Sequence, residues 1–433
     1  MTASDDGPDP YRTPDDGGAI DDGDVRRRRR GGLPFILLTI FIDVLGIGII
    51  IPVLPSLVKS LVGADEVIAG RYVGLIAATY AAMQFVFAPM LGRLSDRWGR
   101  RPVLIVSLIG LGIDFVIQGL ANHIGWLIGG RLMAGAMGAS ITTANAYIAD
   151  ISDEKNRAAN YGMVGVMFGL GFIAGPTLGG VLGDVHLRLP FFVAAGLAFA
   201  NALYGYVVLP ESLPPQKRAA TSFSWSGLNP LSTLADLRRY PGVAGLAVVL
   251  ATKGLAQRGL EVTWVLYATA KFGWSEMTNG LALGWVGLSA LIVQGGVLRV
   301  FVRRFGERSA LVVGMVCSAL AFAAYAFATD GWMVWVIVPF GALGGLAGPS
   351  IQSLVTRRVD EDQQGRIQGA LTSLLSLTSV AAPIVFTAGL YTYFSSPDAP
   401  VYFPGAPLLG GSILITAATL LSLRWITRHP TTD

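Results

Sequence analysis

GRLSDRWGRR, residues 92–101, separates two long apolar runs of this sequence. Its two glycines permit a tight backbone turn, and Asp96 can pair with an arginine or cap a neighbouring helix N-terminus. The flanking runs, 71–93 and 102–121, are each about 20 residues long, which is the length of a helix that crosses about 30 Å of hydrocarbon. The pattern predicts a basic connection of about ten residues between two membrane helices.

The composition points to a chain that is solvated by lipid. Of 433 residues, 52% are apolar and only 14% are charged, and the mean hydropathy is +0.57. A soluble domain carries about 25% charged residues, so this chain has too little charge to cover a globular surface. One cysteine, Cys317, and three scattered histidines give no framework for a disulfide, a metal ion or a catalytic centre. We therefore predict no metal, no cofactor and no catalytic residue.

Twelve apolar runs reach the length of a membrane-crossing helix. The first is too long, and too plainly followed by others, to be a cleaved signal peptide. They lie at about 34–58, 71–93, 102–121, 124–149, 158–182, 190–209, 242–268, 278–300, 309–329, 332–355, 366–391 and 406–426.

Lysine and arginine placement predicts the topology, because basic residues in short loops stay on the cytoplasmic side. The even-numbered connections and both termini hold 25 of the 32 basic residues, and the odd-numbered connections hold 4. Both termini are therefore expected in the cytoplasm. The same distribution explains the pI near 9.2 without a nucleic-acid partner.

Polar stretches divide the chain into four parts. Residues 1–24 contain eight aspartates and almost no large apolar side chain, which is typical of disorder. Arg26 to Arg30 follow as a basic topology anchor, with anionic lipid or nucleic acid as alternative partners. The expected parts are an acidic tail with its basic anchor (1–30), an N-terminal six-helix bundle (31–209), a cytoplasmic linker (210–241) and a C-terminal six-helix bundle (242–433).

The two halves look like duplicates of one another. A shift of about 210 residues aligns GGRLMAGAMGAS (129–140) with PFGALGGLAGPS (339–350), and WGRR (98–101) falls on FGER (305–308). Because six spans is an even number, both copies have the same orientation, as in a parallel repeat of two facing bundles. The fold class expected is an all-α membrane protein with twelve transmembrane helices in two pseudo-symmetric six-helix bundles.

The 92–101 motif, placed after the second span, resembles the signature of the major facilitator superfamily. In that family this loop acts as a latch between the two halves on the cytoplasmic side. The resemblance implies the same role here for Gly92, Asp96, Arg97, Gly99, Arg100 and Arg101. In the second half, Arg299 and Arg303 stand near the places of Gly92 and Asp96, so that copy of the motif has degenerated.

The fifth span carries glycines at four-residue spacing, which form one smooth stripe on a helix. Small residues at this spacing let helices approach closely in lipid, and a proline invites a kink. The pattern resembles the motif of antiporters within the superfamily, with generic helix packing as the alternative. Its residues are Gly171, Gly175, Pro176, Gly179 and Gly180.

Three further stretches resemble the twelve-span drug:proton antiporters, nearest to their tetracycline-efflux branch. They are FIDVLGIGIIIPVLP (41–55), GID (112–114) and GRLMAG (130–135). That branch carries a functional acid in span 9 and a histidine in span 8. Here span 9 reads VCSALAF (316–322) and span 8 has no histidine, so the identity of the drug stays open.

Charged residues inside the spans need a partner, a watery cavity or a function, because each costs on the order of 2.5–3.5 kcal/mol at the bilayer centre. At about 1.5 Å per residue, Asp114 and Arg131 reach similar depths. We predict that they pair or share a water-filled cavity, as groups for proton coupling together with Asp43. A permanent structural ion pair is the alternative. Coupling requires that Asp43 and Asp114 reach a central cavity.

Asp43 and Lys253 are related by the repeat shift of 210 residues. They are predicted to face one another across the two halves, and the alternative is that Lys253 attracts an anionic substrate. Arg258 and Glu261 stand at i and i+3 on span 7, so they are expected to satisfy one another.

Uncharged polar residues in the spans are candidates for the substrate cavity, although such residues also bond neighbouring helices. With Lys253 they form the predicted set Gln84, Gln118, Asn145, Gln257 and Gln294.

These features favour a transporter over an enzyme. No G-x-x-x-x-G-K-[ST] loop occurs, so an ion gradient is the expected energy source, and the buried carboxylates make the proton the expected ion. We predict a monomer in a bacterial inner membrane that exports a small amphiphilic drug by alternating access. A proton-coupled sugar or metabolite transporter is the alternative. A membrane enzyme would need a cluster of acids, histidines or cysteines at the interface, and a receptor or scaffold would leave the paired halves and buried acids unexplained.

Overall fold

The computed structural model describes residues 22–63, 65–138, 140–213, 218, 240–359 and 363–428. Within these ranges every regular element is a helix. Ten helical stretches are long and apolar enough to cross a membrane, and large apolar side chains such as Leu120, Val207 and Trp332 are exposed on their outer faces. Such a surface requires lipid as its solvent. The expectation of an all-α, multi-pass membrane protein is confirmed.

The first half packs its helices around α1, α3 and α4. The α1 helix lies against α7 and α8, α4 lies against α8 and α5, and α3 lies against α5. The helices are α1 (Asp22–Ile50), α2 (Leu54–Leu61), α3 (Glu66–Trp98), α4 (Arg100–Leu120), α5 (Ile124–Met137), α6 (Ser140–Ile151), α7 (Glu154–Val185) and α8 (Leu189–Val207).

The second half packs α17 against both α10 and α12, with α15 beside α10. Short π-helical and 3₁₀ turns interrupt three of its long helices. The elements are α10 (Pro241–Phe272), α11 (Glu276–Ile292), η4 (Val293–Val297), α12 (Leu298–Phe327), α13 (Gly331–Ala342), η5 (Leu343–Leu346), α14 (Ala347–Thr356), α15 (Gln364–Ala382), η6 (Pro383–Tyr391), α16 (Thr392–Phe394) and α17 (Ala406–Arg428).

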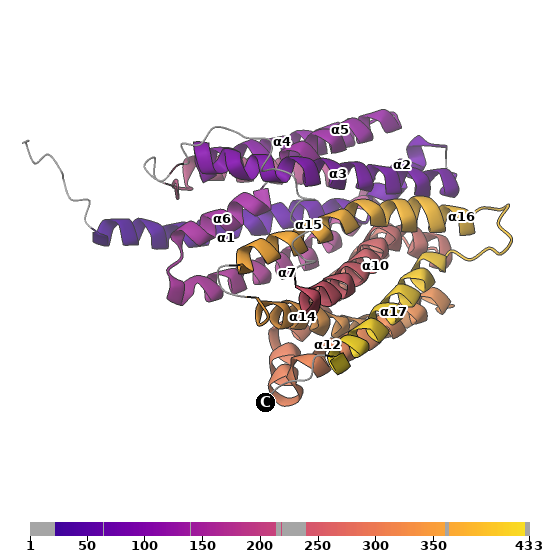
Figure 1. Ribbon diagram of the computed structural model, residues 1–433. Helices are drawn as coiled ribbons and strands as arrows, with labels where there is room; N and C mark the ends of the chain where they lie inside the picture. Colours follow the sequence, from indigo (N-terminus) through magenta and orange to yellow (C-terminus); the bar gives the residue numbers. More distant parts are fainter. Residues whose placement is uncertain are drawn as a thin grey trace, which may run out of the picture.

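Two helix pairs join the halves. The α7 helix packs along α11, and α3 packs along α15 and η6; Figure 1 shows the purple α3 beside the orange α15. One apolar core runs through both halves and includes Phe115 and Phe191 of the first and Trp264 and Tyr267 of the second.

The two halves share one backbone break at positions that the repeat aligns. Gly99 (φ 106°) and Gly306 (φ 78°), 207 residues apart, both adopt a positive φ that only glycine reaches easily. The helix α5 stops before Gly138 and α6 restarts at Ser140, whereas the matching span is broken by the 3₁₀ turn η5. Both fourth spans therefore depart from a regular α-helix, although the 3₁₀ turn at 343–346 lies a few residues before Gly348, the position that the repeat aligns with Gly138.

The twelve expected runs correspond to these helices, but they are not all separate. The stretch Glu276–Phe327 covers two of them, and the turn at Gly306 divides it. The seventh run is α10, which carries Lys253, Arg258 and Glu261 and is not among the ten apolar stretches.

Two expected boundaries were wrong. The 92–101 motif is not a loop of ten residues, because α3 continues through Gly92 to Trp98 and α4 starts at Arg100. Gly99 alone separates the two helices. The first helix begins at Asp22, inside the expected acidic tail. Residues 1–21 of that tail, and most of the expected linker (214–217 and 219–239), lie outside the described residues.

Candidate functional site

Asp114 of α4 is a fully buried acid held by two neighbours. Its Oδ2 accepts a hydrogen bond from the Gln118 amide at 2.7 Å and lies 3.8 Å from Nη2 of Arg131 on α5. The same Arg131 Nη2 donates to Oε1 of Gln118 at 2.9 Å. Gly130 leaves the space that Asp114 occupies, since a Cβ there would stand 2.5 Å from Oδ1. The predicted pairing of Asp114 with Arg131 is confirmed.

Asp43 of α1 meets the break between α5 and α6. Its Oδ2 accepts a 2.6 Å hydrogen bond from the hydroxyl of Ser140, the first residue of α6. The side chain is only 4% exposed. A helix N-terminus carries partial positive charge, so it favours a carboxylate at this place.

A chain of polar groups leads from Asp114 toward Asp43. The Arg131 guanidinium lies over the ring of Tyr80 on α3, 5.5 Å from its centroid. The Gln84 amide donates to the Tyr80 hydroxyl at 3.3 Å and to the Gly138 carbonyl at 3.2 Å. Gly138 lies two residues before Ser140, which bonds Asp43. The contacts therefore run from Asp114 of α4 through Arg131 of α5 to α3 and on to Gly138, while Asp43 and Ser140 form a separate contact two residues further along the chain.

This polar chain borders a cavity of about 350 Å³ between the halves, which we call the central cavity. Tyr80, Gln84 and Arg131 line it from the first half, and Arg258 and Glu261 line it from α10. Asp43 and Asp114 do not line it. The requirement that both acids reach a central cavity is therefore not met directly in this conformation, because Arg131, Tyr80 and Gln84 line the cavity in their place.

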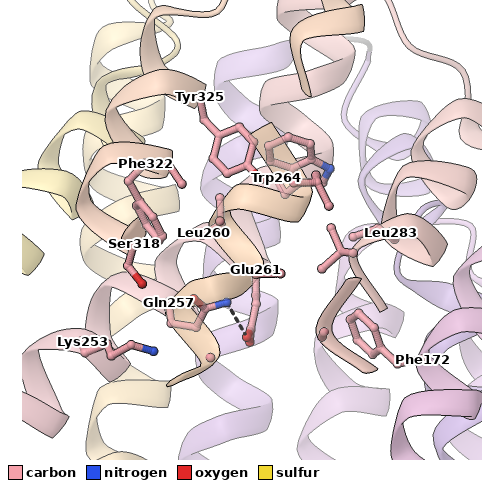
Figure 2. Close-up of a pocket in the computed structure, with 18 of the residues that line it drawn as sticks. Phe172, Lys253, Gln257, Leu260, Glu261, Trp264, Leu283, Ser318, Phe322 and Tyr325 are labelled. Carbon is pink, nitrogen blue, oxygen red and sulfur yellow. Dashed lines mark hydrogen bonds between the residues drawn. The ribbon is translucent and has the colours of Figure 1, made fainter. Parts of the chain in front are cut away.

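A second cavity, of about 270 Å³, lies almost wholly in the second half, and we call it the C-terminal cavity. Figure 2 shows Lys253, Gln257, Glu261 and Trp264 following one another along α10, which forms one of its walls. Gln294 also lines it, and Phe172 of α7 closes it from the first half. Three predicted cavity residues, Lys253, Gln257 and Gln294, therefore lie together.

Glu261 lines both cavities. Its Oε2 accepts a 2.7 Å hydrogen bond and ion pair from Nη1 of Arg258, and its Oε1 accepts from the Gln257 amide at 3.3 Å. The expected Arg258–Glu261 pair is confirmed. The position of Glu261 between two cavities was not expected. In the sequence, Arg258 and Glu261 can neutralise one another on one helix, so nothing indicated a functional role for them.

Two predicted cavity residues and one predicted pair are placed elsewhere. Gln118 is buried in the Asp114 cluster, and the Asn145 carbonyl accepts from the Tyr161 hydroxyl, outside the two cavities. Asp43 bonds Ser140 while Lys253 faces the C-terminal cavity. The expectation that Asp43 and Lys253 face one another was wrong for this conformation, because Ser140 binds the Asp43 carboxylate and Lys253 lies on the wall of a cavity that Asp43 does not line.

The 92–101 motif forms a charged cluster within the first half. Nη1 of Arg100 donates to Asp96 at 2.5 Å and Nε donates to Asp150 of α6 at 3.0 Å. The Glu211 carboxylate, beyond α8, accepts from the backbone N–H groups of Arg100 and Arg101 at 2.9 and 3.3 Å. Glu211 thus caps α4, whose own N-cap, Gly99, has no side chain to do so.

The other residues of the 92–101 motif make fewer side-chain contacts. Arg101 donates to the Gly205 and Tyr206 carbonyls of α8, Arg97 is exposed, and Gly92 has open space around it. The latch between the two halves stays a prediction, since the contacts described here join parts of one half. The degenerate second copy keeps one acid: Glu307 accepts from Ser353 at 2.7 Å and from Arg357 at 2.9 Å.

The glycines of α7 make close contacts on two faces. Cβ atoms at Gly171 and Gly175 would stand 2.9 Å from Val44 and 2.8 Å from the Leu45 carbonyl of α1. A Cβ at Gly179 would overlap the Ile49 carbonyl. On the other face, Pro176 and Gly180 pack on Gly280 and Glu276 of α11. The motif therefore fits α7 between α1 and the second half.

The buried ion pair and the cavity between two similar halves are typical of an alternating-access transporter. The sequence matches the Major Facilitator Superfamily over residues 36–383, and the chain belongs to that family. It is 39% identical over 381 residues to tetracycline resistance protein, class C, of Escherichia coli, covering 88% of this chain and 95% of that relative. Against the class B protein of the same species, identity is 33% over 350 residues, covering 81% and 86%. The resemblance drawn from the motifs is confirmed.

Solved structures agree on the fold. The human organic anion transporter MFSD10 (TETRAN) superposes with a TM-score of 0.68 at 23% identity, covering 91% of this chain and 99% of that one. The nucleoside transporter NupG (D323A mutant) superposes with a TM-score of 0.73 at 13% identity, covering 92% and 100%. These neighbours are transporters of small molecules, not enzymes.

Sequence reasoning missed the partners that hold the predicted residues. Tyr80 and Ser140 complete the polar chain, and Asp150 and Glu211 complete the cluster at Arg100. A helix start at Gly99 followed by two arginines lacks a capping side chain, which is a signal that an acid from elsewhere is needed. No comparable signal in the sequence marks Ser140 as the partner of Asp43.

Proposed function

We propose that this protein exports an amphiphilic drug, with tetracyclines among the candidates, in exchange for protons by alternating access. The relatives named tetracycline resistance proteins support this proposal, because they align with the chain over nearly their whole lengths. The observation that carries it is the polar chain that leads from buried Asp114 through Arg131 to the cavity between the halves, with the buried Asp43–Ser140 pair close to its end in the sequence.

Both acids are built to gain and lose a proton. Asp43 and Asp114 each have one oxygen in a hydrogen bond and one, Oδ1, that is buried without a partner. An ionised carboxylate with an unsatisfied oxygen is costly away from water, and protonation removes that cost. Arg131 favours the ionised form of Asp114 as long as the ion pair is closed. Separation of Arg131 from Asp114 then favours uptake of a proton.

The drug and the proton compete for the same charges in this proposal. Arg131 belongs both to the Asp114 pair and to the wall of the central cavity. A ligand in that cavity that draws the guanidinium away would leave Asp114 to be protonated. Binding at one place thereby changes the proton affinity of the other, which is the linkage that exchange requires.

The proposal includes the oligomeric state, the membrane location and the orientation of the protein. The protein is a monomer in the inner membrane of a bacterium, with lipid around its apolar faces and both termini in the cytoplasm. The positive-inside distribution of its basic residues supports that orientation.

Everted membrane vesicles test the exchange directly. With the interior acidified, wild-type vesicles should accumulate labelled tetracycline, and an ionophore that collapses the pH gradient should abolish the uptake. Asp43→Asn and Asp114→Asn should each abolish gradient-driven uptake while the protein remains inserted in the membrane, because neither amide can carry the proton.

Three results would contradict this proposal. Normal uptake by both variants would remove these acids from the coupling step. Wild-type vesicles that accumulate a sugar or metabolite but no drug of a broad panel would favour the alternative transporter. Uptake that persists without a pH gradient would exclude the proton as the coupling ion.

A further inference from the structure

The walls of the C-terminal cavity suit the body of an aromatic or apolar molecule. Trp264 and Tyr325 pack edge to face with ring centroids 5.2 Å apart, and Phe322 and Leu260 extend the same surface. A cavity volume of about 270 Å³ lies close to the lower end of the range of drug-sized sites. Apolar rings would therefore fill most of this space.

The acid of this cavity is already neutralised. Glu261 binds the Arg258 guanidinium through one carboxylate oxygen and the Gln257 amide through the other. An added cation would have to displace Arg258 before it could use this carboxylate. The acid therefore does not leave a free negative charge for a ligand.

Lys253 is the unbalanced charge of the cavity. No hydrogen bond or ion pair joins its ammonium group to any residue that the structure describes, whereas Lys271 of the same helix donates to the Ala326 carbonyl at 2.9 Å. Glu261, eight residues further along the helix, is the acid whose charge acts on Lys253 across the cavity, but its carboxylate is already held by Arg258. Figure 2 shows the Lys253 amine directed into the interior on the side of Gln257 and Ser318.

An ammonium group inside a membrane-spanning bundle is costly unless an opposite charge meets it. We infer that the C-terminal cavity binds an anionic amphiphile, with its anionic group on Lys253 and its aromatic body against Trp264 and Tyr325. This assignment rests on the proposed export function. It implies that the substrates of the exporter are amphiphiles that carry a negative charge at the end opposite to their apolar rings. An anionic lipid headgroup and a free organic anion present the same chemistry to Lys253.

Two fluorescent probes with the same ring system test this inference. 8-Anilinonaphthalene-1-sulfonate carries a sulfonate, and N-phenyl-1-naphthylamine is its neutral counterpart. Calorimetric titration into the full chain in nanodiscs of zwitterionic lipid, with empty nanodiscs subtracted, gives both dissociation constants. Lys253→Met should weaken sulfonate binding by at least about tenfold, the loss of one charge-assisted contact, and should change binding of the neutral probe by less than about twofold.

Control variants separate charge from packing. Lys253→Arg keeps the cation and should retain sulfonate binding. Lys271→Met removes a cation from the same helix outside the cavity and should leave both probes unaffected. Equal sulfonate binding by wild type and Lys253→Met would overturn the assignment, and so would an equal loss of both probes. If Lys253→Met does not insert, Lys253→Gln gives the same comparison.

Anionic lipid distinguishes the two sources of the ligand. If a headgroup occupies the cavity, raising the fraction of phosphatidylglycerol should weaken sulfonate binding to wild type. The residual sulfonate binding of Lys253→Met, which does not depend on Lys253, should stay unchanged. If only solutes enter, phosphatidylglycerol should have no effect. Binding is measured without a gradient, so Lys253-dependent binding in a protein that exports nothing would refute the proposed function and leave the anion site standing.

Discussion

At the scale of single residues, the Asp114 cluster depends on a residue that has no side chain. Gly130 precedes Arg131 on α5, so one turn of this helix supplies both the cation and the space for the acid. Because the space is filled by a carboxylate oxygen, even a methyl group would displace it. The geometry of the ion pair is therefore set by a glycine that carries no charge.

Gly130→Ala should disable exchange without removing any charged group. Its Cβ would stand 2.5 Å from Asp114 Oδ1, which should shift the carboxylate from Arg131 and cost about 1–3 kcal/mol of folding free energy. Gradient-driven uptake in everted vesicles should fall several-fold. Gly129→Ala, where no atom lies within 4 Å, is the matched control and should transport normally. Wild-type uptake by Gly130→Ala would show that the cluster tolerates the displacement.

At the scale of elements, α7 is one of the helices of the first half that also pack on the second half. One face packs on α1 and the other on α11, and glycines occur on both faces. Without a hydrophobic driving force in lipid, the closeness of these contacts supplies the stability. The sequence motif is thus explained by packing, whatever it also contributes to the direction of transport.

Gly179→Ala should separate α1 from α7. Its Cβ would overlap the Ile49 carbonyl, and a backbone atom cannot move aside as a side chain does. We expect a loss of about 1–3 kcal/mol, seen as a lower thermal midpoint in detergent by size-exclusion chromatography. Gly165→Ala on the same helix meets no atom within 4 Å and should keep or raise the midpoint, since alanine is the better helix former. Equal midpoints for the two variants would contradict this account of the motif.

At the scale of the whole molecule, the halves meet closely at Thr177 of α7 and Gly284 of α11. A Cβ at Gly284 would lie 3.8 Å from the Thr177 Cβ, which is the usual separation in a disulfide. Alternating access requires the halves to rock against each other at such contacts. A bond across them should therefore hold the protein in one conformation.

Thr177→Cys combined with Gly284→Cys, in a Cys317→Ser background, tests this movement. Oxidation should stop gradient-driven uptake and a reductant should restore it, while each single-cysteine variant should be insensitive to oxidant. Mass spectrometry of the linked peptides establishes that the bond has formed. If the fully cross-linked protein transports as fast as the protein treated with reductant, the moving contacts lie elsewhere.

Charged residues show where sequence reasoning worked and where it stopped. The pairing of Asp114 with Arg131 could be predicted, because depth along two adjacent helices follows from residue counting at a fixed rise. Asp43 and Lys253 also match in depth by the repeat, yet Asp43 bonds Ser140 and Lys253 faces a cavity. Depth alone does not say which way a side chain points around its helix.

The sequence by itself determined that this chain lies in lipid, that its spans form two similar halves, and which family it belongs to. These conclusions depend on composition, run length and local motifs, which are properties of the chain order. Only the tertiary structure decided that Glu261 lies between two cavities, that Glu211 caps α4, and that the Lys253 ammonium has no hydrogen bond or ion pair with the residues that the structure describes. Helix rotation and packing set those relations, because in lipid nearly every face is apolar and the sequence pattern does not distinguish the inward face from the outward one.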